Sequence, residues 1–139
     1  MAHGPVRAVY NRAMMRPALA LSLFAMLPAL HAAPAAPAVG DPKAGAAVFR
    51  VCASCHQVGP NARNAFGPQL NGLWGRRAGS AQYAYSAAMK KSAVVWNDRT
   101  LAAFLRDPDD VVPGTKMRLW GFSDERKVAN LLAYLRQYQ

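Results

Sequence analysis

The chain has 139 residues, a length that suits a single domain with a modest core. Its 17 Lys and Arg residues outnumber 7 Asp and Glu residues, which gives a formal net charge of +10. Such a balance fits nucleic-acid binding, docking on an acidic protein, or a solvated surface without a partner. The N-terminal segment argues against nucleic acid, because it predicts export.

The first 32 residues have the composition of a secretory signal peptide. Three arginines, at positions 7, 12 and 16, precede any acidic residue: Arg7, Arg12 and Arg16. An uncharged apolar run at residues 17–30 follows and leads into small residues. As a helix, the apolar run rises about 21 Å, which is short of a bilayer core of about 30 Å. We expect residues 1–32 to be removed and the mature chain to be periplasmic. Cleavage is expected after Ala32, and the alternatives are cleavage after Ala33, Ala35 or Ala38, an uncleaved anchor, and a start at Met14 or Met15.

Removal of residues 1–32 would leave a flexible Ala/Pro-rich lead at residues 33–40 and one domain over residues 41–139. Three arginines and no acidic residue would be lost, so that the net charge would fall from +10 to +7. This basic balance outside the cytoplasm favours a partner with an acidic surface. His56 would be the only histidine, and the sulfur-containing residues would be Cys52, Cys55, Met89 and Met117.

A first helix is predicted to start near Asp41, which can cap it, with Pro42 in its first position. This helix leads into the segment at residues 52–56. From residue 57 to residue 85, repeated Gly, Pro and Asn residues predict a loop. A loop of this length is unusual inside a compact domain unless it wraps a bound group. The sequence therefore favours a cofactor held between loops.

The second half of the chain predicts three more helices. Two short helices are expected near residues 86–92 and 100–106, and Pro108 stops the second. Residues 107–122 are expected to be a loop, and Ser123 is expected to cap the last helix. The apolar residues of that helix have amphipathic spacing: Val128, Leu131, Leu132 and Leu135. No segment shows sustained strand alternation, so the predicted class is all-α with long loops.

The strongest chemical signal is the pattern C-x-x-C-H at residues 52–56, which is typical of c-type haem attachment. A gap of two residues lets both thiols face one side of a turn and reach the two vinyl groups of one porphyrin, while His56 approaches the iron. The alternatives are a redox disulfide and a chance occurrence, whereas zinc needs more ligands than the mature chain offers. We favour haem c, because the motif uses every Cys and His of the mature chain.

A sixth iron ligand has two candidates. Met117 follows Pro113 and Gly114 in a predicted loop, from which it can reach the face of the ring opposite His56. Met89 lies in a predicted helical turn, where methionine commonly fills a core. We favour Met117 and keep Met89 as the alternative. Ligation by His and Met raises the reduction potential and closes the iron to other ligands, which favours a carrier over a catalyst.

Nearly all of residues 40–137 resembles the class I cytochromes c, in particular the mitochondrial type and its bacterial relatives. The matching segments are GDPKAG, CASCHQVG, FGPQLNGLWGRRAGS, YAYSAAMKKSAVVWND, LAAFLRDP, VPGTKM and LLAYL. The resemblance implies a cytochrome c fold around one haem. It also implies thioether bonds at Cys52 and Cys55, with His56 and Met117 as the iron ligands.

The resemblance implies roles for several further residues. The carbonyl group of Pro68 would accept a hydrogen bond from His56 and fix the tautomer of the ring. A group of residues, with Ser86 as a further member, would lie near the haem propionates: Arg76, Tyr85, Trp96 and Thr115. The first and last helices would cross at a second group: Gly45, Phe49, Leu131 and Tyr134.

Three positions depart from the family pattern. Phe104 stands where the family often has a tyrosine near the methionine sulfur, and Leu119 stands where an aromatic residue is usual. Met89 replaces a common asparagine and brings a second thioether close to the pocket. These changes affect the surroundings of the sixth ligand and the packing at the haem edge.

The function implied by the resemblance is that of a monomeric one-electron carrier in a respiratory or photosynthetic chain. Its partners would be an oxidase, a reaction centre or a quinol-oxidising complex with an acidic docking surface. Two alternatives stay open: a small haem enzyme that is peroxidase-like or binds a gas, and the haem subunit of a periplasmic dehydrogenase. An enzyme usually needs a distal acid–base residue, and the mature chain has no second histidine for this role.

Overall fold

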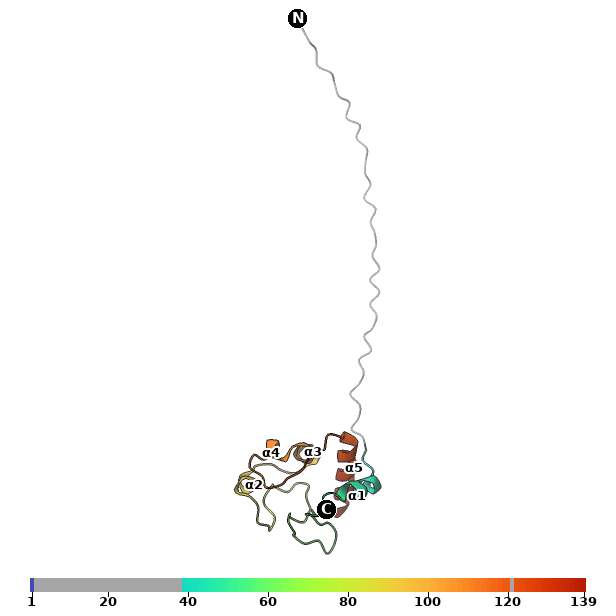
Figure 1. The fold of residues 1–139 in the computed structure, drawn as a ribbon, viewed down its shortest axis with the longest axis vertical. Coiled ribbons are helices and arrows are strands. Elements are labelled where there is room, and N and C mark those ends of the chain that lie inside the picture. Colours follow the sequence, from blue (N-terminus) through green and yellow to red (C-terminus); the bar gives the residue numbers. More distant parts are fainter. Residues whose placement is uncertain (2–38, 121) are drawn as a thin grey trace. The chain divides into compact units, whose positions relative to one another are not determined.

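The computed structural model of the protein describes residue 1, residues 39–120 and residues 122–139. The predicted signal peptide, beyond residue 1, and residues 33–38 of the predicted lead fall outside the described residues. The helices are α1 (Pro42–Phe49), α2 (Ala87–Lys91), α3 (Asp98–Arg106), α4 (Pro108–Val111), α5 (Glu125–Leu135) and the 3₁₀-helix η1 (Arg136–Tyr138), as Figure 1 shows. Within the described residues, the one β contact is an isolated bridge between Arg77 and Val95. The class is therefore all-α, as predicted.

Helix α1 begins as the sequence predicts. The Asp41 side chain accepts a hydrogen bond from the Lys43 amide at 2.8 Å, and Pro42 occupies the first turn, where its missing N–H costs nothing. The Asn130 side chain on α5 accepts a hydrogen bond from the Asp41 amide at 2.8 Å. The start of α1 is thereby tied to the last helix of the chain.

Helices α1 and α5 lie side by side (Figure 1) and cross at Gly45. A Cβ atom at Gly45 would overlap the Asn130 carbonyl group and would lie 2.7 Å from the Cβ atom of Tyr134. The rings of Phe49 and Tyr134 lie 5.4 Å apart, next to Leu131, which is 1% exposed. This confirms the predicted crossing, which fixes the end of α1 and the segment after it.

Gly40 corrects the predicted boundary of the flexible lead. A Cβ atom at Gly40 would overlap the Ala129 carbonyl group and would lie 2.9 Å from the Cβ atom of Ala133. Residue 40 therefore packs against α5 and belongs to the folded domain. The sequence predicts that residue 40 belongs to the flexible lead because Gly40 follows an Ala/Pro-rich run.

Two predicted helix starts are wrong, and side-chain caps explain both. Helix α3 starts at Asp98, two residues before the predicted position, because Asn97 and Thr100 form a capping box with two 2.9 Å hydrogen bonds. Helix α5 is capped by Asp124 instead of Ser123, since the Asp124 carboxylate accepts hydrogen bonds from the Arg126 and Lys127 amides at 2.9 and 3.1 Å.

The predicted loop at residues 107–122 contains an unpredicted helix, α4. Pro108 ends the preceding helix, as expected, but it also occupies the first turn of α4. The Asp107 side chain caps α4 and accepts hydrogen bonds from the amides of Asp109 and Asp110 at 3.1 and 3.2 Å. Helix α2 agrees with its prediction, and the Ser86 side chain caps it by accepting from the Met89 amide at 3.1 Å.

The predicted loop from residue 57 to residue 85 is confirmed, since no helix lies within it. Together with the segment that follows α4, it surrounds a cavity in front of α5. Among the described residues, no helix combines the length and the apolar character that crossing a bilayer requires.

Candidate functional site

Loops and helices from the whole domain enclose a cavity of about 440 Å³. This volume lies within the range of about 300–1,000 Å³ that is typical of ligand and cofactor pockets. The walls include every site residue that the sequence predicts: Cys52, Cys55, His56, Pro68, Arg76, Tyr85, Trp96, Thr115 and Met117. Met89, the alternative iron ligand, lines the cavity as well. The fold therefore gathers residues from distant parts of the sequence around one space.

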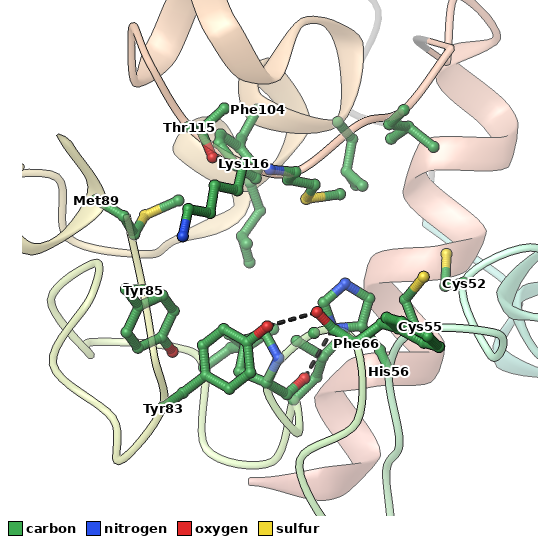
Figure 2. A pocket seen from close by; sticks show the side chains of 18 of the residues that line it. Cys52, Cys55, His56, Phe66, Tyr83, Tyr85, Met89, Phe104, Thr115 and Lys116 are labelled. Carbon is green, nitrogen blue, oxygen red and sulfur yellow. Dashed lines mark hydrogen bonds between the residues drawn. The ribbon is translucent and has the colours of Figure 1, made fainter. Parts of the chain in front are cut away.

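The ring of His56 is oriented by a single backbone acceptor. Its Nδ1 atom lies 2.7 Å from the carbonyl oxygen of Pro68, which can only accept a hydrogen bond. Nδ1 therefore carries the proton, and Nε2 keeps a free lone pair that is turned toward the cavity (Figure 2). Neutral imidazole with a free Nε2 is the form that binds a metal ion.

The backbone of Gly67 lies against the His56 ring and supports this orientation. The sequence does not predict this role. A Cβ atom at this position would lie 2.7 Å from Nδ1 and 2.9 Å from Nε2 of His56, so the ring rests directly on the glycine backbone. The Gly67 amide also donates to the carbonyl oxygen of Cys55 at 2.9 Å. The available signal is the position of Gly67 directly before Pro68, but in a sequence such a pair predicts only a loop.

The two cysteines lie on one turn beside the histidine. The amides of Cys55 and His56 both donate to the carbonyl oxygen of Cys52, at 3.0 and 2.9 Å. Both thiols are free, and Figure 2 shows them at the same end of the cavity as the His56 ring. Burial, and then the neighbouring Cys55, raise the pKa of the Cys52 thiol from 9.0 to about 11. Near neutral pH this thiol is therefore protonated.

Both methionines of the domain reach the cavity. Met117 is half-buried in the loop after α4, where its amide donates to the Thr115 hydroxyl group at 3.3 Å. Met89 is 7% exposed on the short helix α2, at the side of the cavity opposite Cys52 and Cys55 (Figure 2). The geometry therefore brings two thioether groups to the cavity.

A set of hydrogen-bond donors lines a further part of the wall. The Arg76 guanidinium donates to the Asn71 carbonyl oxygen at 2.8 Å and has other N–H groups available. Burial raises the pKa of Tyr85, and the positive charge of nearby Arg76 partly offsets this rise. Thr115 is only 2% exposed, and its hydroxyl group keeps its own proton free while accepting from Met117. Such donors suit a carboxylate group of a bound ligand.

The rest of the wall is apolar and belongs to the core of the domain. Buried side chains from α1, α3 and α5 face the cavity: Phe49, Leu101, Phe104, Leu105, Leu131 and Leu135. Phe104 is 6% exposed and packs on Trp96 with ring centroids 5.1 Å apart. A flat apolar group with two acidic arms, bound to the two thiols and to one imidazole, fits these residues. The donor set and the walls therefore match a covalently attached haem.

A contact at the edge of the cavity was also missed in the sequence. The hydroxyl group of Tyr83 donates to the carbonyl oxygen of Phe66, and the Tyr83 ring meets Tyr85 edge-on at a centroid distance of 5.0 Å (Figure 2). The Asn64 side chain donates to the Gln82 carbonyl oxygen at 2.6 Å. These contacts join the two ends of the long loop around the cavity. No spacing pattern in the sequence predicts them.

Three comparisons with known proteins all find relatives of one family. The model of the Cytochrome c family matches residues 42–139. The chain is 45% identical over 109 residues to a cytochrome c2 from Blastochloris viridis, which covers 77% of this chain and 86% of the relative. It is 42% identical over 100 residues to a cytochrome c-550 from Nitrobacter winogradskyi, which covers 71% of this chain and 92% of the relative.

The solved structure of cytochrome cH from Methylobacterium extorquens is similar as well. It matches with a TM-score of 0.66 and 42% sequence identity, over 70% of this chain and 99% of that structure. Sequence family, relatives and solved structure thus agree with the fold class that the sequence predicts.

Proposed function

Because the chain belongs to the class I cytochrome c family, whose members carry covalently attached haem c, we propose that it is a periplasmic one-electron carrier with a single haem ligated by His56 and Met117. The observation that carries the proposal is the turn with Cys52, Cys55 and His56 at the wall of an apolar cavity of about 440 Å³. When bound, the haem supplies an iron that alternates between the ferric and ferrous states.

The chain holds and tunes this group with its own residues. The sulfur atoms of Cys52 and Cys55 would hold the haem through thioether bonds, and the Nε2 atom of His56 would bind its iron. The Pro68 carbonyl oxygen, 2.7 Å from Nδ1, fixes the tautomer of the ring and raises its basicity. Hydrogen-bond donors in the wall would hold the two propionates, with Ser86 as a further candidate: Arg76, Tyr85, Trp96 and Thr115. Buried apolar side chains exclude water, which is one of the properties that set a reduction potential.

Met117 is the proposed sixth ligand, because it lies in the segment VPGTKM, which resembles the family pattern, and lines the cavity. Gly114, with φ of +85°, lets the chain turn sharply before Met117. Met89 is fixed on both sides: Ser86 accepts from its amide at 3.1 Å, and a Cβ atom at Gly79 would lie 2.7 Å from its carbonyl carbon. The ferric protein should show the methionine-to-iron charge-transfer absorption, and Met117→Ala should abolish it. Met89→Ala should keep it.

The attachment itself is tested by the double variant Cys52→Ala/Cys55→Ala. Without either sulfur, we expect little stable haem-loaded protein and no haem mass retained on the chain after acid denaturation. Mass spectrometry of the wild-type protein from periplasm should show the mass of one haem together with the N-terminus left by signal cleavage. Recovery of a full complement of acid-resistant haem in the double variant would disprove the attachment.

The proposed partners are redox proteins with acidic docking surfaces, such as an oxidase, a reaction centre or a quinol-oxidising complex, and the carrier acts on them as a soluble monomer. Two exposed cations, Lys116 and Arg118, line the cavity where a partner would approach the haem. Lys90 and Lys91 end α2, and Arg63 lies in the long loop. The mature net charge of +7 favours encounter with such an acidic protein surface, and nucleic acid is not a proposed partner.

A further inference from the structure

Trp120 is the one tryptophan among the described residues that is fully exposed. It is 100% exposed, whereas Trp96 is 7% exposed. Trp74 is half-buried, and its indole N–H donates to the Asp98 carboxylate at 2.9 Å. A tryptophan side chain can bury about 150–250 Å² of surface, and it is among the residues that most often dominate protein interfaces. Full exposure therefore indicates a surface that is completed by another molecule.

Trp120 lies next to the proposed haem cavity. It follows Leu119, which lines the haem cavity, and consecutive Cα atoms are about 3.8 Å apart. Two further exposed apolar residues line the same cavity, Val51 at 63% and Phe66 at 87%. A partner that approaches the cavity over these residues would therefore meet exposed apolar groups.

The charges on the same loop indicate the charge of the partner surface. Lys116 and Arg118 are exposed and line the cavity, and the chain has no acidic residue between Asp110 and Asp124. The Arg118 guanidinium donates to the carbonyl oxygen of Thr115 at 2.9 Å, which holds its charge on the loop. The complementary surface has carboxylates around an apolar pocket.

We propose that Trp120 is the anchor that retains this carrier on its redox partner by inserting into an apolar pocket rimmed by carboxylates. The inference rests on the proposed carrier function and assigns two separate roles to the loop. Long-range attraction by Lys116 and Arg118 sets the rate of encounter, which falls as salt screens the charges. Burial of the Trp120 ring sets the lifetime of the complex, which salt affects little.

The test uses the ferrous, haem-loaded protein and respiratory membranes from the organism that encodes the chain, with oxidation of the haem as the readout. Trp120→Ala should raise KM by about tenfold or more, as expected for loss of a buried anchor, and should leave the salt dependence unchanged. Lys116→Gln/Arg118→Gln should slow oxidation at low salt and flatten its salt dependence. Val95→Ala, at a position that is 46% exposed and does not line the cavity, is the matched control and should change neither quantity.

Two further measurements separate this proposal from the carrier function. The reduction potential and the rate of reduction by ascorbate should be the same in Trp120→Ala and wild type. An unchanged KM in Trp120→Ala would overturn the anchor and leave the carrier function intact. Wild-type protein that neither ascorbate reduces nor membranes oxidise would overturn both. Binding of wild type, but not of Trp120→Ala, to vesicles of phosphatidylcholine and phosphatidylglycerol would assign Trp120 to lipid and would also overturn the anchor.

Discussion

At the scale of single residues, Gly67 places the proposed iron ligand by having no side chain. The His56 ring rests against its backbone, and the next residue, Pro68, accepts the hydrogen bond from Nδ1. One short segment thus provides both the space for the ring and the acceptor that orients it. The orientation of His56 depends on contacts 11 and 12 residues further along the chain, and C-x-x-C-H alone does not reveal them.

Gly67→Ala should therefore displace the ring of His56 and weaken its bond to iron. We expect a loss of about 1–3 kcal/mol in the free energy of unfolding, as for other overpacked sites, together with a changed ferric spectrum. Gly72→Ala is the control: a Cβ atom there meets nothing within 4 Å, but φ of +61° strains the backbone. It should lower stability and leave the spectrum as in wild type. Equal spectra for both variants would show that Gly67 has no role in positioning His56.

Phe104 offers a second test at the residue scale, because it lines the cavity together with Met117 and the family resemblance implies a tyrosine hydroxyl group at its position. In Phe104→Tyr, a hydroxyl group directed at the sulfur would draw electron density from it and stabilise ferric iron less. The reduction potential should rise by at most about 60 mV, since a hydrogen bond of about 0.5–1.5 kcal/mol sets the scale. Voltammetry and thermal unfolding of the same variant separate this effect from strain against Trp96. An unchanged or lower potential in a variant with an unaltered spectrum would contradict the argument.

At the scale of helices, the sequence predicts the long apolar faces better than the helix ends. Asp41 and Pro42 mark the start of α1 because the two signals agree. Before α5, Ser123 and Asp124 are both capable caps, and only the geometry of the chain selects Asp124. Helix α4 has four residues, which is too short for periodicity to reveal it.

The close crossing of α1 and α5 depends on Gly45. Replacement of Gly45 by alanine should therefore have two opposite effects on stability. By intrinsic propensity, Gly45→Ala should stabilise α1 by about 1 kcal/mol. The added methyl group, however, would overlap the Asn130 carbonyl group, which is backbone and cannot rotate away. We expect overpacking to outweigh propensity and to lower the midpoint of denaturant unfolding. Exposed Ala47→Gly is the comparison and should cost about 1 kcal/mol through propensity alone; a Gly45→Ala protein more stable than wild type would argue against a close crossing.

At the scale of the whole molecule, the chain folds around a space that it does not fill itself. The sequence predicts this indirectly, through a 29-residue loop at positions 57–85, a length that is unusual in a compact domain unless the loop wraps a bound group. It also predicts nine residues that the structure places in the wall of this cavity, among them the local motif at residues 52–56. It does not predict Tyr83 with Phe66 or Gly67 with His56, since those contacts join loop segments without any periodic pattern.

Removal of the haem should therefore unfold the domain. An empty cavity of about 440 Å³ lined by core side chains would cost about 10 kcal/mol, at about 24 cal/mol per Å³. A domain of this size has a total stability of only about 5–15 kcal/mol, so partial collapse of the walls would leave little or none of it. The haem-free Cys52→Ala/Cys55→Ala chain should show low helix content by circular dichroism and no cooperative thermal transition, unlike the haem-loaded wild type. A cooperative transition with the helix content of wild type would mean that α1, α3 and α5 support the fold without the cofactor.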